Sequence, residues 1–396
     1  MKQSLLLVIF VVPVNGFAGA MTQSSGDVDA ATGERSAFGF ADVNRIAEGL
    51  AHKPYEPDRP ELPEGFKNLQ YDDYRDIRFR RAKGIWFDSG LPFQVQLFAR
   101  GFLFHDRVRI NIISDTGASP IRFSRDMFGY GKNKVPAEVP RDFGFAGFRI
   151  LYPLHREDHM DEVAAFLGAS YFRAVGQKQN YGVSARALAI DTGLETPEEF
   201  PVFREFWIQE PSPDDTAITV FALLDSQRAT GAYRFVIQPG LQTVIDVKAR
   251  ILLRDAVEKL GIAPLTSMFY HGELTERYMD DFRPEVHDSD GLLIASGSGE
   301  RIWRPLRNPV TLQITSFQVT NPRGFGLMQR DRSFEHYQDT QTPYQTRPSA
   351  WVETLGDWGE GTVELVEIPS GSERNDNIVA FWHPAQPLKP LSPAEF

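Results

Sequence analysis

The sequence has 396 residues, of which 42% are hydrophobic, and it carries 42 lysines and arginines against 53 aspartates and glutamates. A chain of this size buries a large core, and its net charge of -11 gives no general attraction for a phosphate backbone, which argues against nucleic acid as a partner. It contains no cysteine, which excludes disulfides, thiolate catalysis and thiolate metal sites.

The first twenty residues have the layout of a secretory signal peptide. Lys2 precedes an apolar run over residues 5–14, and small residues end the segment at Ala20. We therefore expect cleavage after Ala20 and export, followed by a flexible segment over residues 21–37. The apolar run is shorter than the ~20 residues that a membrane-spanning helix requires, and no later segment comes closer.

Two segments show the spacing of amphipathic helices. In residues 40–50 the apolar side chains recur every three or four positions, and the pattern stops before Pro54. In residues 156–168, Met160 and Leu167 fall on one helical face with the apolar residues between them. The sequence therefore predicts one long and one short helix.

A pair of histidines, His155 and His159, has the four-residue spacing of zinc ligands on a helix. The acidic residues around them do not fit that motif, and the segment is strongly polar, so a solvated helix start is the simpler interpretation. We predict no metal site and no cofactor.

Elsewhere β-branched and aromatic runs alternate with clusters of Gly, Pro, Asn and Asp, which predicts strands. The clearest runs are 216–225, 232–239, 241–253, 311–319, 362–369 and 377–384. Because turns and not helices link them, the pattern excludes a parallel βαβ sheet and favours an all-β fold, a large antiparallel sandwich with a few short helices. Prolines recur every three residues from Pro384 to Pro393, which predicts an extended linker over residues 385–396.

The most acidic loop of the chain is "DDFRPEVHDSDGLLI", residues 280–294. Asp and Ser side chains bond to nearby backbone amides, so a solvated turn and a functional carboxylate both explain the stretch. A calcium loop fits poorly, because Gly291 follows Asp288 by only three residues. The residues alone leave the first two interpretations open.

A second candidate is "PSGSERNDNIVAFWHP", where Glu373 and Asp376 precede the aromatic Phe381 and Trp382. A carboxyl beside apolar rings has a raised pKa, as a general acid requires, but an ordinary turn opening a strand explains the stretch equally well. Aromatic and arginine side chains such as those in "TPYQTRPSAWVE" are suited to lining a sugar groove. No serine-hydrolase elbow, Walker loop or dinucleotide fingerprint is present.

Five blocks resemble the periplasmic glucan biosynthesis protein G/D family, and the resemblance runs from about residue 38 to residue 384. They are "DDFRPEVHDSDGLL", "TNPRGFGLMQRDRSFEHYQD", "RPSAWVE", "GDWGEGTVELVEIP" and "NDNIVAFWHP". The resemblance implies a galactose-mutarotase-like β-sandwich over residues 38–384, followed by a smaller immunoglobulin-like domain. We expect residues 385–396 to be the linker to that second domain, and we do not expect the domain itself within these 396 residues.

The resemblance also implies a periplasmic protein acting on the β-1,2-linked backbone of osmoregulated periplasmic glucans. Some members of the family are anomer-inverting endo-β-1,2-glucanases or transglycosylases, whereas a non-catalytic glucan-binding factor is the alternative. Carried over to this sequence, Asp376 would be the general acid and Asp288 the general base, with Tyr344, Arg347 and Glu373 lining the glucan groove. No metal is then needed, and a homodimer is compatible with the resemblance.

Overall fold

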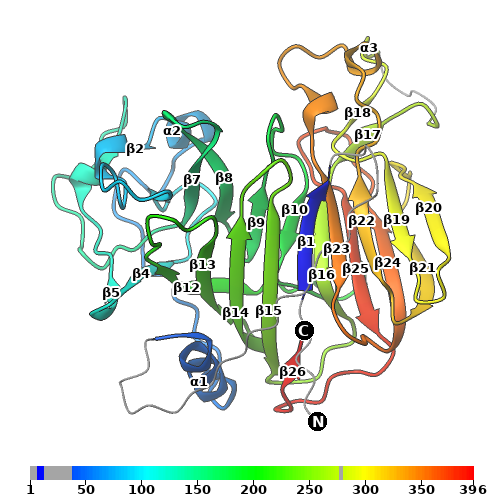
Figure 1. The fold of residues 1–396 in the computed structure, drawn as a ribbon, viewed down its shortest axis with the longest axis horizontal. Coiled ribbons are helices and arrows are strands. Elements are labelled where there is room, and N and C mark those ends of the chain that lie inside the picture. The colour runs from blue at the N-terminus through cyan, green and yellow to red at the C-terminus, as the bar shows by residue number, and fades with distance from the viewer. Residues whose placement is uncertain (1–6, 13–37, 276–279) are drawn as a thin grey trace.

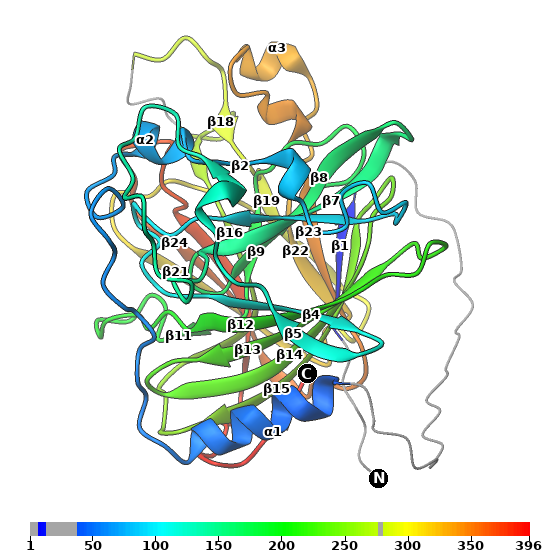
Figure 2. The same cartoon turned by 90° about the vertical axis from the view of Figure 1, so that its left-hand side faces the viewer.

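Two large antiparallel sheets form the body of the molecule in the computed structural model, which describes residues 7–12, 38–275 and 280–396 (Figures 1 and 2). One sheet has twelve strands and the other has ten. Helices are few and short. The predicted all-β antiparallel sandwich is therefore confirmed, and within the described residues no helix is long and apolar enough to cross a membrane.

The twelve-stranded sheet has the order β20-β19-β22-β23-β1-β15-β14-β13-β12-β4-β5, with β26 also paired to β15. All its pairs are antiparallel except β4 with β12. Its strands are β1 (Leu7–Val12), β4 (Arg109–Ser114), β5 (Gly117–Pro120), β12 (Val202–Gln209), β13 (Ile218–Asp225), β14 (Ala229–Gln238), β15 (Val244–Leu253), β19 (Gly291–Ala295), β20 (Arg301–Pro305), β22 (Gly324–Met328), β23 (Ser349–Thr354) and β26 (Ala394–Glu395).

The ten-stranded sheet has the order β21-β24-β25-β16-β10-β9-β8-β7-β3, with β11 also paired to β16. Its strands are β3 (Gln94–Phe98), β7 (Gly147–Arg156), β8 (His159–Leu167), β9 (Tyr171–Ala174), β10 (Ser184–Arg186), β11 (Leu188–Ile190), β16 (Leu260–Ser267), β21 (Gln313–Thr320), β24 (Glu360–Glu367) and β25 (Ile378–Pro384). Two small ribbons pair β2 (Arg78–Phe79) with β6 (Phe128–Gly129), and β17 (Phe269–His271) with β18 (Val286–His287).

Aromatic side chains fill the space between the two large sheets. Phe148 on β7 packs edge-on against Phe206 on β12, with ring centroids 5.0 Å apart. Phe166 on β8 meets Phe235 on β14 at 5.2 Å. Strand β15 shows the local cause, since its buried and partly exposed residues alternate along the strand and one face therefore meets the core.

The helix predicted for residues 40–50 is confirmed as α1 (Phe40–Ala51). Asp42 accepts a hydrogen bond from the backbone amide of Gly39 at 2.9 Å, which satisfies a donor at the helix start. Val43 and Ala47 are buried against the outer face of the twelve-stranded sheet, where Trp207 lies. The other helical segments are α2 (Tyr71–Arg75), α3 (Phe334–Tyr337), η1 (Arg81–Lys83), η2 (Arg125–Met127) and η3 (Tyr344–Thr346).

The short helix predicted for residues 156–168 is wrong. These residues turn at 157–158 and return as β8, antiparallel to β7. Phe166 stacks on Phe148 of β7 with ring centroids 4.9 Å apart, so packing into the core outweighs a helical spacing of apolar residues.

Both ends of the chain contribute strands to the twelve-stranded sheet. Residues 7–12 form β1 between β15 and β23, while the rest of the predicted signal peptide lies outside the described residues, and its cleavage stays a prediction. At the other end, β26 pairs with β15, and Phe396 is buried and exchanges two backbone hydrogen bonds with Ala249. The last residues therefore pack on the sheet, contrary to the expectation of an extended segment without packing.

Candidate functional site

The five residues expected to act on a glucan lie beside β18, η3 and β25. Figure 1 shows β17, β18 and α3 together at one end of the sheets. Asp288 directly follows β18, and Glu373 and Asp376 lie in the loop between β24 and β25. Tyr344 begins η3, and Arg347 follows it. Three separate segments of the chain thus supply the site.

Asp288 is buried, with 10% of its side chain exposed. The pKa of its carboxyl is raised to about 6, because burial, helped by the charge of Asp376, outweighs the lowering effect of Arg347. Nε of Arg347 lies 2.9 Å from Oδ1 of Asp288, although neither atom makes a directed hydrogen bond. The ion pair is close, and both partners keep hydrogen-bonding capacity toward a ligand.

Asp376 is more accessible, with 32% of its side chain exposed. Burial raises the pKa of its carboxyl, while the positive charges of Arg173, Arg186 and Arg347 lower it. Nη2 of Arg173 lies 3.8 Å from Oδ2 of Asp376. The charge of Asp376 raises the pKa of Asp288, which places the two carboxyls within the range of a direct electrostatic interaction.

Glu373 is held by Arg283, whose guanidinium contacts three carboxylates from different loops. Nη2 lies 2.6 Å from Glu373 and 2.7 Å from Asp281, and Nη1 lies 2.8 Å from Asp339. Tyr344 is buried, and the guanidinium of Arg347 lies 5.5 Å from the centre of its ring. Burial raises the pKa of the Tyr344 hydroxyl, with Glu373 and Asp288 contributing. The tyrosine therefore lies near Arg347, Glu373 and Asp288.

Two buried amides that the sequence interpretation did not single out hold these loops in register. Asn377 accepts a hydrogen bond from the Phe269 amide at 2.9 Å and donates to the Phe269 carbonyl at 3.0 Å. Since Phe269 pairs with His287 in the β17–β18 ribbon, Asn377 ties the loop of Asp376 to the strand that immediately precedes Asp288.

Gln329 is the second buried amide, and its side chain bridges β18 and η3. Its Oε1 contacts Nδ1 of His287 at 2.9 Å, and its Nε2 lies 3.1 Å from the carbonyls of His287 and Tyr344. Gln329 is fully buried, so bulk water is not in contact with its partners to take over its hydrogen bonds if the side chain is removed. The sequence alone gives little indication of the role of either amide, because their hydrogen-bond partners are distant in the chain.

One group of three side chains among the described residues could hold a metal ion, namely Glu285, Asp331 and His336. Each already has a partner, since Glu285 contacts Nε2 of His287 at 2.7 Å and His336 contacts Asp331. His155 and His159, which the sequence placed on a helix, lie instead at the ends of β7 and β8, each near Asp161. We assign no metal to either group.

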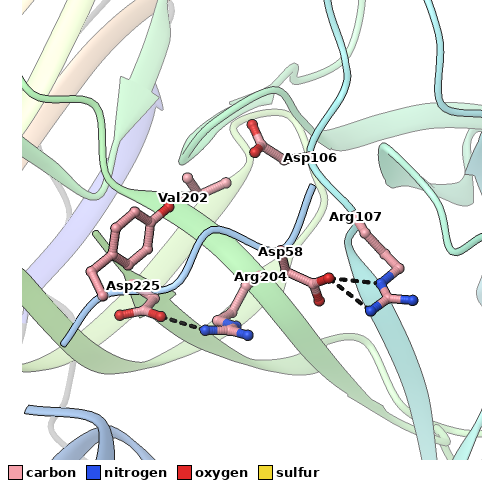
Figure 3. A pocket seen from close by; sticks show the side chains of 7 residues that line it. Asp58, Asp106, Arg107, Val202, Arg204 and Asp225 are labelled. Atoms are coloured by element: carbon pink, nitrogen blue, oxygen red, sulfur yellow. Dashed lines mark hydrogen bonds and ion pairs between the residues drawn. The ribbon is translucent and has the colours of Figure 1, made fainter. Parts of the chain in front are cut away.

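Two small cavities accompany these features. One, of about 20 Å³, is lined by Arg173, Ser184 and Pro348 and has room for about one water molecule. The other, of about 10 Å³, lies between ion pairs that join Asp58 to Arg107 and Arg204 to Asp225 (Figure 3). The second shares no residue with the candidate site and is too small for a sugar.

The fold and the site define a class of protein, a large antiparallel β-sandwich with one buried and one partly exposed carboxylate near arginines in its loops. Residues 38–396 match the model of the family described as "Periplasmic glucan biosynthesis protein, MdoG". The chain belongs to this family, whose description implies the periplasm.

Three relatives illustrate the similarity, and each is described as "Glucans biosynthesis protein G". The protein from Ralstonia nicotianae is 54% identical over 357 residues, covering 90% of this chain and 71% of its own length. That from Sodalis glossinidius is 51% identical over 348 residues, with 88% and 67% covered. That from Pseudomonas aeruginosa is 50% identical over 360 residues, with 91% and 69% covered.

Proposed function

We propose that this protein acts on β-1,2-linked glucan backbones in the periplasm, as an anomer-inverting endo-β-1,2-glucanase or a transglycosylase. We further propose that residues 38–384 form the glucan-binding domain. The observation that carries the proposal is a buried carboxyl, Asp288, and a partly buried one, Asp376, whose pKa values are both raised mainly by desolvation and which both lie near arginines.

The chemistry assigns one task to each carboxyl. An inverting hydrolysis needs one carboxylic acid to protonate the leaving oxygen and one carboxylate to take a proton from the attacking water. We assign the first task to Asp376, which is the more accessible of the two, and the second to Asp288. With its pKa at about 6, Asp288 is mostly ionised at neutral pH, as a base must be.

Tyr344, Arg347 and Glu373 are the proposed groove residues. A guanidinium and a carboxylate hold sugar hydroxyls by hydrogen bonds, and an aromatic ring packs on a sugar face. Arg347 also contacts Asp288, so the same side chain would touch the glucan and hold the base. The alternative function, glucan binding without turnover, uses the same residues and differs only in the absence of bond cleavage.

The test compares Asp376→Asn and Asp288→Asn with the wild-type protein on purified linear β-1,2-glucan. Each variant should lose at least ~10²-fold in turnover and keep wild-type glucan affinity, because the amide preserves shape and removes only proton transfer. Asp246→Asn is the matched control. Asp246 is also a partly buried carboxyl with a raised pKa and an arginine partner, Arg234, but it lies outside the site.

Azide separates the two assigned roles. A small anion that replaces the activated water should restore glycosyl transfer in a base variant, Asp288→Ala, and not in Asp376→Ala. If azide rescues only the Asp376 variant, the assignment is reversed, with Asp376 as the base and Asp288 as the acid. If the wild-type protein binds the glucan and releases no product, the non-catalytic alternative holds.

A further inference from the structure

Arg173 stands out among the residues near Asp376 because no sequence motif pointed to it. It lies on β9, where its neighbours Phe172 and Ala174 are buried in the core, and 44% of its own side chain is exposed. Its backbone is therefore fixed by packing, while its guanidinium reaches out of the sheet toward the loop that carries Asp376.

A second contact fixes the direction of this guanidinium. Nε of Arg173 donates a hydrogen bond to Oγ of Ser184 at 2.6 Å, and Ser184 is buried on the neighbouring strand β10. With Nε occupied, the outer edge of the guanidinium is directed to Asp376, with Nη2 3.8 Å from Oδ2. The gap is too long for a hydrogen bond, so the contact is an ion pair whose donor is not used up by the carboxylate.

The charged and titratable groups that act on Asp376 come from several elements. They are Arg173 on β9, Arg186 on β10 and Arg347 after η3, and the charge of Asp376 in turn acts on Asp288 after β18 and on Tyr171 on β9. Arg186 is buried and paired with Glu198 at 2.7 Å, and Arg347 is paired with Asp288 at 2.9 Å. Arg173 is the one of these three cations whose carboxylate partner is Asp376 itself.

We propose that Arg173, anchored by Ser184, is a positioning residue for the reaction assigned to this site, which holds the Asp376 side chain and stabilises the carboxylate left after proton donation. The inference rests on the proposed function. In that reaction the proton of Asp376 moves to the glycosidic oxygen as its bond to the anomeric carbon breaks. A water oxygen bonds to that carbon and its proton passes to Asp288, so one water is consumed.

The physical reason is that the acid becomes an anion in a partly buried place. A positive charge at this distance favours the ionised form, whereas burial opposes it. The transition state, in which negative charge grows on Asp376, is thus stabilised by Arg173 more than the ground state is. Ser184 adds rigidity, because an exposed arginine loses much side-chain entropy when a single geometry is required.

The test measures the titration of Asp376 directly and needs no turnover. In ¹³C NMR of the protein labelled at aspartate carboxyls, the Asp376 resonance is identified by its loss in Asp376→Asn. Arg173→Met should raise the pKa of Asp376 by about 1, Arg173→Lys by clearly less, and the matched control Arg156→Met not at all. Arg156 forms an exposed pair with Asp158 on the β7–β8 hairpin and is not among the charges that act on Asp376.

Turnover on linear β-1,2-glucan gives the second readout. Arg173→Met should lower kcat about tenfold, leave KM within about twofold and move both limbs of the pH profile upward, because Asp288 also loses a nearby positive charge. Ser184→Ala should lower kcat without moving the limbs, because the charge remains.

Two results would overturn the inference. An Asp376 titration unchanged in Arg173→Met shows that the cation does not act on the acid. If Arg173→Met lowers both the melting temperature and the glucan affinity, and Arg173→Lys does not restore them, the residue has a structural role instead. If the wild-type protein does not cleave glucan, the proposed function fails, while the NMR titration still decides whether Arg173 controls Asp376.

Discussion

At the scale of single residues, Asp288 shows how burial and charge compete at one carboxyl. Desolvation favours its neutral form and Arg347 favours its charged form, and the result is a pKa of about 6. A carboxyl that titrates near neutrality makes the stability of the protein depend on pH, because the unfolded chain binds that proton only below ~4.

The direction of this pKa shift determines whether stability rises or falls with pH. Because the folded pKa is raised, the contribution of Asp288 to stability is complete below pH ~4 and is lost as the pH rises through about 6. Asp288→Asn stays neutral, so its free energy of unfolding relative to wild type should increase between pH 4 and 6 and level off roughly 3 kcal/mol higher. Urea unfolding of both proteins at pH 4 to 8 measures this difference in free energy of unfolding. A difference that does not vary with pH would show that the pKa of Asp288 is not raised in the folded protein.

At the scale of elements, the sequence predicts what depends on local pattern. The helix at 40–50 and all six strand segments occur, because each is specified by its own spacing of apolar residues. The helical spacing at 156–168 fails, because the hairpin with β7 and the contact of Phe166 with Phe148 are decided by distant residues.

The candidate site follows the same division. The family resemblance pointed to Asp288, Asp376, Tyr344, Arg347 and Glu373. Without it, the spacing of the carboxyls is explained equally well by a functional site and by an ordinary turn. Gln329 and Asn377 had no pattern of their own, because their roles depend on partners in other loops. Arg173 likewise resembles an ordinary polar strand residue in the sequence, and only the structure shows its contact with Asp376.

Two glycines test the packing of individual elements. Gly49 in α1 is exposed, and an added Cβ at this position would meet no atom within 4 Å, whereas at Gly326 in β22 it would lie 2.2 Å from the Ala350 carbonyl oxygen of β23. Gly49→Ala should stabilise the protein by about 0.5–1 kcal/mol, since alanine favours helix.

Gly326→Ala should destabilise the protein by roughly 2 kcal/mol or more, because β22 and β23 must move apart. Denaturant unfolding of the two variants side by side gives both values. Equal effects of the two substitutions would contradict the close pairing of β22 with β23.

At the scale of the whole molecule, the two large sheets form a packed scaffold, and the candidate site lies in loops at one end of it. The net charge of -11 would contribute little to the proposed binding of a neutral glucan, which would rest on local hydrogen bonds and ring contacts. Arg283, Arg347 and Arg173 supply positive charge at the site, and each contacts at least one of its carboxylates.

The measurement that tests this account most directly is ¹H NMR of the wild-type protein acting on linear β-1,2-glucan, with the anomeric signals of new reducing ends followed from the first minutes. New reducing ends should appear first as the α-anomer, since inversion at a β-linkage gives α, and they should be absent with Asp376→Asn. Early β-anomer, or equal cleavage by Asp376→Asn, would contradict it.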